Sequence, residues 1–142
     1  MEIDLYYPPR QSRYVYRTSK LFGLTGLYAL YQGLAPFAVL YTVICFTSLN
    51  YWRKPKHSLR RIVDMYAVGF VLVYQNLYVL FSRDIFKEYN VNLYYLFFFT
   101  GSLAYPVSLC AYQRKRYWTA IYLHMTLHLM ANFASLCLFA GI

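Results

Sequence analysis

The sequence predicts an all-α, polytopic integral membrane protein: a bundle of about four transmembrane helices preceded by an amphipathic or interfacial N-terminal helix. Two observations carry this prediction. Hydrophobic residues make up 60% of the 142 residues and charged residues only 13%, against about 25% charged in ordinary soluble domains. Several apolar runs also approach the ~20 residues that a helix needs to cross a bilayer. A chain of this length fits one domain.

The N-terminal part, residues 1–33, is predicted to combine a basic arm with a helix that lies at the membrane surface or enters it partly. Its basic residues recur at spacings of three and four, so they share one helical face: Arg10, Arg13, Arg17 and Lys20. The uncharged stretch 21–52 is too short for two crossings and a turn. Gly33 and Pro36 indicate a break within it, since glycine suits the position after one helix and proline the first turn of the next.

Residues 34–142 are predicted to form the transmembrane bundle. Its four predicted spans are residues 36–52, 62–81, 91–112 and 117–141. The linkers between them are short, so no soluble domain is expected. The sequence does not indicate which cellular membrane holds the protein.

The distribution of Lys and Arg gives two different answers for topology. With four crossings, residues 53–61 and 113–116 bring eight basic residues to one side, and the N-terminal arm and residues 82–90 bring six to the other. If residues 21–52 instead crossed an even number of times, the arm would join the first side and the count would be twelve against two. The positive-inside rule favours the second arrangement. The segment lengths favour four crossings, which is the arrangement predicted here.

The formal charge of +9 resides mainly between the apolar runs. This placement indicates topology signals and contacts with anionic lipids rather than a nucleic-acid-binding surface. The three cysteines, Cys45, Cys110 and Cys137, all lie within apolar runs and are expected to act as small hydrophobic residues. The expected partners are therefore the lipid bilayer and other membrane protein subunits or further copies of this chain.

The last predicted span carries a polar stripe. His124, His128, Asn132 and Ser135 lie within about one quarter of its circumference. Lipid cannot satisfy such groups, so the stripe must face protein, water or a ligand. Two histidines four residues apart on one helical face are able to bind one metal ion together.

Two further polar residues are expected near the same membrane face as His124. Ser48 lies one turn before the end of the first span, and Asp64 lies in the first turn of the second. The predicted site has Ser48 and Asp64 as catalytic residues and His124, His128 and Asp64 as metal ligands. A zinc ion held there would lower the pKa of its bound water, which would attack a lipid amide or ester. The HxxxH pair lacks the glutamate base of the HExxH motif.

This order of residues resembles the CREST superfamily of membrane hydrolases, which includes alkaline ceramidases and adiponectin-receptor-type proteins. Ser48, Asp64, His124 and His128 match the family pattern in order. The resemblance implies a zinc ion held by three histidines, with the serine and the aspartate supporting the bound water. The family has seven spans, and its SxxxH motif reads SLNYW here, so Trp52 stands in the place of the first zinc ligand.

Three functions remain open from the sequence, and it does not decide whether the protein is an enzyme. The leading prediction is a structural or interaction subunit of a membrane assembly, in which the histidines bond to neighbouring helices and Asp64 pairs with Arg60 or Arg61. The alternative is the zinc-dependent lipid hydrolase. The third is a transporter or proton-conducting subunit, for which a second deep carboxylate is missing.

Overall fold

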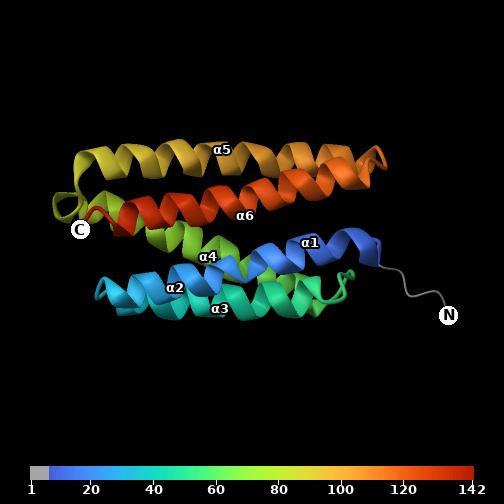
Figure 1. Cartoon of the computed structure of the whole chain (residues 1–142), viewed down its shortest axis with the longest axis horizontal. Coiled ribbons are helices and arrows are strands. Elements are labelled where there is room, and N and C mark those ends of the chain that lie inside the picture. Colours follow the sequence, from blue (N-terminus) through green and yellow to red (C-terminus); the bar gives the residue numbers. More distant parts are fainter. Residues whose placement is uncertain (1–6) are drawn as a thin grey trace.

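The computed structural model describes residues 7–142, which form six α-helices and one short 3-10 helix (Figure 1). The elements are α1 (Pro9–Ser19), α2 (Leu21–Tyr31), α3 (Ala35–Trp52), α4 (Leu59–Phe81), η1 (Arg83–Ile85), α5 (Glu88–Gln113) and α6 (Tyr117–Phe139). The predicted all-helical architecture is confirmed for this part of the chain. Residues 1–6 of the predicted basic arm lie outside it.

The predicted break in the first apolar stretch is confirmed. Gly33 adopts a φ of 77° just after α2, a left-handed conformation that glycine adopts without steric cost. The N–H of Gly33 bonds to the carbonyl of Leu30 at 3.0 Å, and that of Leu34 bonds to the carbonyl of Ala29 at 2.8 Å. This is the Schellman pattern of helix termination. Pro36 then occupies the first turn of α3, where its missing N–H costs nothing.

The helices run back and forth along one long axis (Figure 1). Only Lys20 separates α1 from α2, and its backbone is itself helical (φ −65°, ψ −24°). The two helices therefore continue in one direction and together run the length of the bundle, and α3 returns beside α2. The four-span prediction placed the N-terminal arm at the end opposite to the 53–61 linker. The structure differs, because α1 begins at the same end as that linker.

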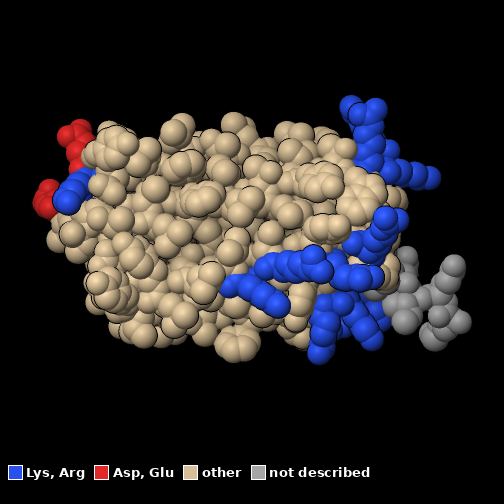
Figure 2. Space-filling view, viewed as in Figure 1, with Lys and Arg blue, Asp and Glu red and all other residues tan. Residues whose placement is uncertain are grey.

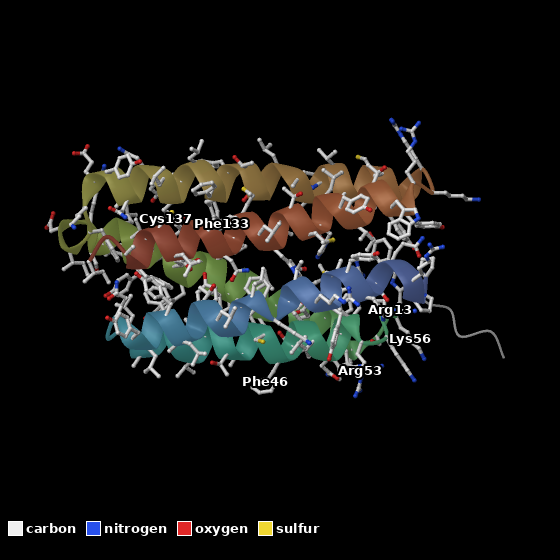
Figure 3. All side chains as sticks on the ribbon, viewed as in Figure 1. Arg13, Phe46, Arg53, Lys56, Phe133 and Cys137 are labelled. Atoms are coloured by element: carbon white, nitrogen blue, oxygen red, sulfur yellow. The ribbon has the colours of Figure 1, made fainter. Side chains whose placement is uncertain are left out.

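Within the described part of the chain, three helices are long and apolar enough to cross a membrane, namely α4, α5 and α6. They correspond to the predicted spans 62–81, 91–112 and 117–141. The predicted span 36–52 forms α3, which has 18 residues and is not among the three. Large apolar side chains point outward from the bundle, as Phe46 of α3 does with 69% exposure (Figure 3). These features are compatible with an integral membrane protein.

One hydrophobic core joins both sides of the break at Gly33. Phe22 and Ala29 of α2 and Phe37 of α3 lie in the same buried cluster as Phe139 of α6. Helix α6 packs against α5, α1 and α2, whereas α4 packs chiefly against α3. Helix α6 is thus the central helix, and α4 lies at the edge.

The charges separate between the two ends of the molecule. Lys and Arg side chains gather at the end where α1 begins, and acidic side chains with a basic one among them appear at the other end (Figure 2). Arg13 of α1 lies at the same end as Arg53 and Lys56, which follow α3 (Figure 3). We call this the basic end; the opposite end contains η1.

Candidate functional site

The polar stripe of α6 faces the interior of the bundle, as predicted. His128, Asn132 and Ser135 are all buried. The hydroxyl oxygen of Thr18 in α1 lies 3.1 Å from Nδ1 of His128. One turn further on, the hydroxyl of Thr25 in α2 donates to the side-chain oxygen of Asn132. Polar side chains on successive turns of α6 therefore form hydrogen bonds with different helices.

The third group of hydrogen bonds along the stripe connects α6 to α3 and α4. The Tyr41 hydroxyl of α3 hydrogen-bonds to the Ser135 hydroxyl and donates to Oε1 of Gln75 at 2.6 Å. Nε2 of Gln75 in α4 donates to the Ser135 hydroxyl at 3.1 Å. Each of the three polar groups thus has two partners among the others, which satisfies them away from water.

Ser48 and Asp64 lie together, as the sequence suggested. The Ser48 hydroxyl donates to Oδ1 of Asp64 at 2.7 Å, and the Thr47 hydroxyl donates to the same oxygen at 3.0 Å. Both residues of the Ser48–Asp64 pair are buried. Asp64 was predicted to pair with Arg60 or Arg61; of these, the Arg60 guanidinium donates to the backbone carbonyl of Asn50 at 3.4 Å. Asp64 therefore joins α4 to α3.

The residues of the predicted zinc site do not converge. The rings of His124 and His128 lie 5.0 Å apart, so the sequence paired them correctly. The Trp52 ring packs on His124 with the centroids 4.8 Å apart, which puts an indole where the resemblance implies a third imidazole. Within residues 7–142, no three His, Cys, Asp or Glu side chains come together. A catalytic zinc ion needs three protein ligands beside its bound water, so the donor set does not fit the metal.

Sequence reasoning missed the residues that bond to the α6 stripe, namely Thr18, Thr25 and Tyr41. Thr18 and Thr25 are seven residues apart, which puts them on one face when α1 and α2 continue as one helix. That spacing was the available signal. Tyr41 carried no comparable signal, since it is one of 18 tyrosines.

Asn76 differs from the other carboxamides within the apolar helices. Gln75 and Asn132 bond to neighbouring helices. The Asn76 side chain is instead partly exposed and donates back to the Leu72 carbonyl of its own helix at 2.8 Å. Its carboxamide thus faces away from the bundle.

Comparisons with protein-family models, with curated proteins and with solved structures give no match to this chain.

Proposed function

We propose that the protein is a structural or interaction subunit of a membrane assembly. The buried polar groups that suggested chemistry are engaged in joining helices: Thr18 with His128, Thr25 with Asn132, Tyr41 with Gln75 and Ser135, and Ser48 with Asp64. Hydrogen bonds and close packing are what hold helices together in lipid, because the hydrophobic effect does not act between them there. The arrangement supports a role in packing rather than in hydrolysis.

The observation that carries the proposal is the outward face of α4. Asn76 presents a carboxamide there, and within residues 7–142 its bond is to its own helix. Gly69 lies two turns earlier on the same face, and a Cβ added to it would meet no atom within 4 Å. A small residue lets another helix approach closely, and an intramembrane carboxamide gains a hydrogen bond when it does. The partner is thus a transmembrane helix of another subunit or of a second copy.

We expect Asn76→Leu to reduce this association without unfolding the chain. The substitution removes the outward hydrogen-bonding group and leaves the buried contacts of α4 in place. The measurement is chemical cross-linking in native membranes followed by native electrophoresis in mild detergent. Wild-type chain should migrate in a complex larger than its own 16.9 kDa plus detergent, and the variant should shift to the free chain.

The matched control for this experiment is Thr100→Leu. Thr100 is an exposed polar residue on α5 that bonds back to the Leu96 carbonyl of its own helix at 2.8 Å. Its side chain therefore has the same kind of hydrogen bond as that of Asn76, but on a different helix. The substitution should leave the complex intact. A wild-type chain that runs alone from native membranes would contradict the proposal, and so would equal loss of the complex in both variants.

We further propose that the chain crosses the membrane five times, with α1 and α2 together forming the first crossing and α3 the second. Twenty-three residues from Pro9 to Tyr31 would span ~34 Å as a helix. On this path, twelve Lys and Arg residues lie on one side of the membrane and two on the other. The positive-inside rule then assigns the basic end to the cytosolic side. Long Arg and Lys stems allow α1 to enter the membrane while their charges reach its surface.

Single-cysteine labelling tests the number of crossings. Cys45, Cys110 and Cys137 are first replaced by alanine, and a cysteine is then introduced at Pro9, Gln113 or Asp84. A membrane-impermeant maleimide should label the Pro9 and Gln113 positions from the cytosolic side and the Asp84 position from the other. If the chain crosses four times, the reagent should instead label Pro9→Cys and Asp84→Cys from the same side of the membrane.

A further inference from the structure

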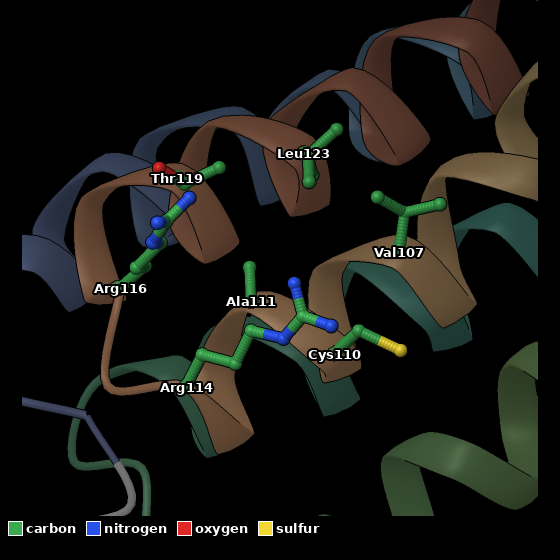
Figure 4. Close-up of a pocket in the computed structure, with 7 residues that line it drawn as sticks. All are labelled: Val107, Cys110, Ala111, Arg114, Arg116, Thr119 and Leu123. Atoms are coloured by element: carbon green, nitrogen blue, oxygen red, sulfur yellow. The ribbon is translucent and has the colours of Figure 1, made fainter.

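A groove between α5 and α6 opens at the basic end (Figure 4). It has a volume of about 170 Å³, which is room for roughly six groups the size of a water molecule. Val107 and Ala111 of α5 and Leu123 of α6 make its surface apolar, and Arg114 and Arg116 carry their guanidinium groups along its margin. We call this the α5–α6 groove.

The turn between the two helices holds both arginines at this position. Lys115 lies between them with a φ of 58°, a left-handed conformation that is uncommon for residues other than glycine. The N–H of Lys115 bonds to the Tyr112 carbonyl, and that of Arg116 bonds to the Ala111 carbonyl, each at 2.9 Å. This closed turn fixes the backbones of Arg114 and Arg116 on its two sides, so two positive charges share one small opening.

The groove lies at the level where lipid headgroups are expected. Trp118 follows Arg116 by two residues and is 36% exposed, and tryptophan concentrates at the membrane–water interface. The guanidinium of Arg10 stacks over the Trp118 ring at 5.8 Å from its centroid. Helix α6 also begins here without a capping side chain, and the partial positive charge of a helix N-terminus favours an anion.

We propose that the α5–α6 groove binds an anionic glycerophospholipid. The phosphate lies between the guanidinium groups of Arg114 and Arg116, which form bidentate hydrogen bonds with phosphate oxygens. The upper part of one acyl chain lies over Val107, Ala111 and Leu123. Charge complementarity selects the headgroup, and the apolar surface requires that the phosphate carries a chain. Basic pockets between transmembrane helices bind such lipids in other membrane proteins.

The test is native mass spectrometry of the full chain in detergent, titrated with phosphatidylglycerol or phosphatidylcholine. Wild-type protein should bind phosphatidylglycerol roughly thirtyfold more tightly, since each of the two arginines near the lipid phosphate contributes on the order of 1 kcal/mol. Arg114→Gln with Arg116→Gln should abolish the preference. Arg53→Gln with Lys54→Gln removes the same charge from the same end outside the groove and should keep it.

Two further arms separate the lipid from a simpler anion. Thr119→Phe introduces a ring at the wall of the groove and leaves both arginines; it should weaken phosphatidylglycerol binding several-fold. Glycerol phosphate, which has the headgroup charge without a chain, should not compete at concentrations that saturate the lipid site. Equal losses of the lipid preference in the Arg114/Arg116 and Arg53/Lys54 double variants would overturn the proposal, and so would full competition by glycerol phosphate.

A measurement on the wild-type chain avoids any question of misfolded variants. Cys110 lines the groove and is exposed, so its alkylation rate, followed by peptide mass spectrometry, should fall several-fold with phosphatidylglycerol and not with phosphatidylcholine. An unchanged rate would overturn the proposed position of the lipid. Lipid binding is measured on the isolated chain, so the result does not depend on whether the chain associates with other subunits.

Discussion

Tyr41→Ala is expected to lower the free energy of unfolding by about 3 kcal/mol. Tyr41 is 4% exposed, and its ring packs against Phe22 and Phe139 with centroid distances of 6.3 and 6.0 Å. Removing the ring leaves a cavity where α2, α3 and α6 meet. The cavity cost remains in a membrane, although the transfer cost shrinks because the unfolded state also lies in lipid. The measurement is reversible unfolding in mixed detergent micelles, followed by tryptophan fluorescence.

Tyr41→Phe separates the ring from the hydroxyl in this experiment. The variant keeps the packing and loses two hydrogen bonds, while Gln75 and Ser135 still bond to each other at 3.1 Å. Interhelical hydrogen bonds in membranes average about 0.6 kcal/mol, so a loss of about 1 kcal/mol is expected. Tyr31→Ala, at a position that is 83% exposed, should change little. A loss as large for Tyr41→Phe as for Tyr41→Ala would show that hydrogen bonding, rather than packing, dominates here.

Gly101→Leu is expected to destabilise the chain by about 3 kcal/mol, because α5 and α6 approach each other closely at this point. A Cβ added to Gly101 would lie only 3.0 Å from Cβ of Met130. The remaining carbons of a leucine would force the helices apart along the most extensive helix pair of the bundle. The same micelle unfolding experiment measures the loss.

Gly69→Leu provides the matched comparison, since it makes the same chemical change on α4, another helix that is long and apolar enough to cross a membrane. A Cβ added there meets no atom within 4 Å, and leucine favours the helix over glycine by about 0.8 kcal/mol. The stability of the isolated chain should therefore stay the same or rise slightly. Equal destabilisation by the two substitutions would mean that helix flexibility, and not the close approach of α5 and α6, explains the effect at Gly101.

The positions of the long helices could be predicted because the length of an apolar run fixes them directly. The predicted spans 62–81, 91–112 and 117–141 differ from α4, α5 and α6 by at most three residues at either end. The break near Gly33 was equally readable, because a left-handed glycine and a proline in the first turn of a helix have local steric causes.

The path of the first two helices could not be read in the same way. The prediction counted only the uncharged residues 21–33 as able to enter the membrane, and that stretch is too short to cross it. In the structure α2 is continued by α1 through a helical Lys20, so charged residues supply the missing length in the five-crossing path that we propose. The distribution of basic residues indicated that α1 and the 53–61 linker share one end of the bundle, but the segment lengths favoured the other arrangement.

The candidate site was predictable within one helix and not between helices. Helical periodicity paired His124 with His128, and depth in the membrane brought Ser48 next to Asp64. Which side chain meets His128 from another helix depends on how the helices pack and rotate, and a single sequence does not encode that locally. The spacing of Thr18 and Thr25 was readable from the sequence, but the contact of Thr18 with His128 came from the structure.

In the five-crossing arrangement that we propose, the Gly33 turn has a consequence for how the chain enters a membrane. Three basic residues in α1, together with Lys20 just after it, oppose transfer of the N-terminal end across the bilayer. A chain that keeps this end on the side of synthesis has to insert α2 and α3 together as a helical hairpin, with the turn at its leading tip. The Schellman bonds of Gly33 and Leu34 cap α2 from within, so the tip passes through the lipid with fewer open carbonyl groups to dehydrate.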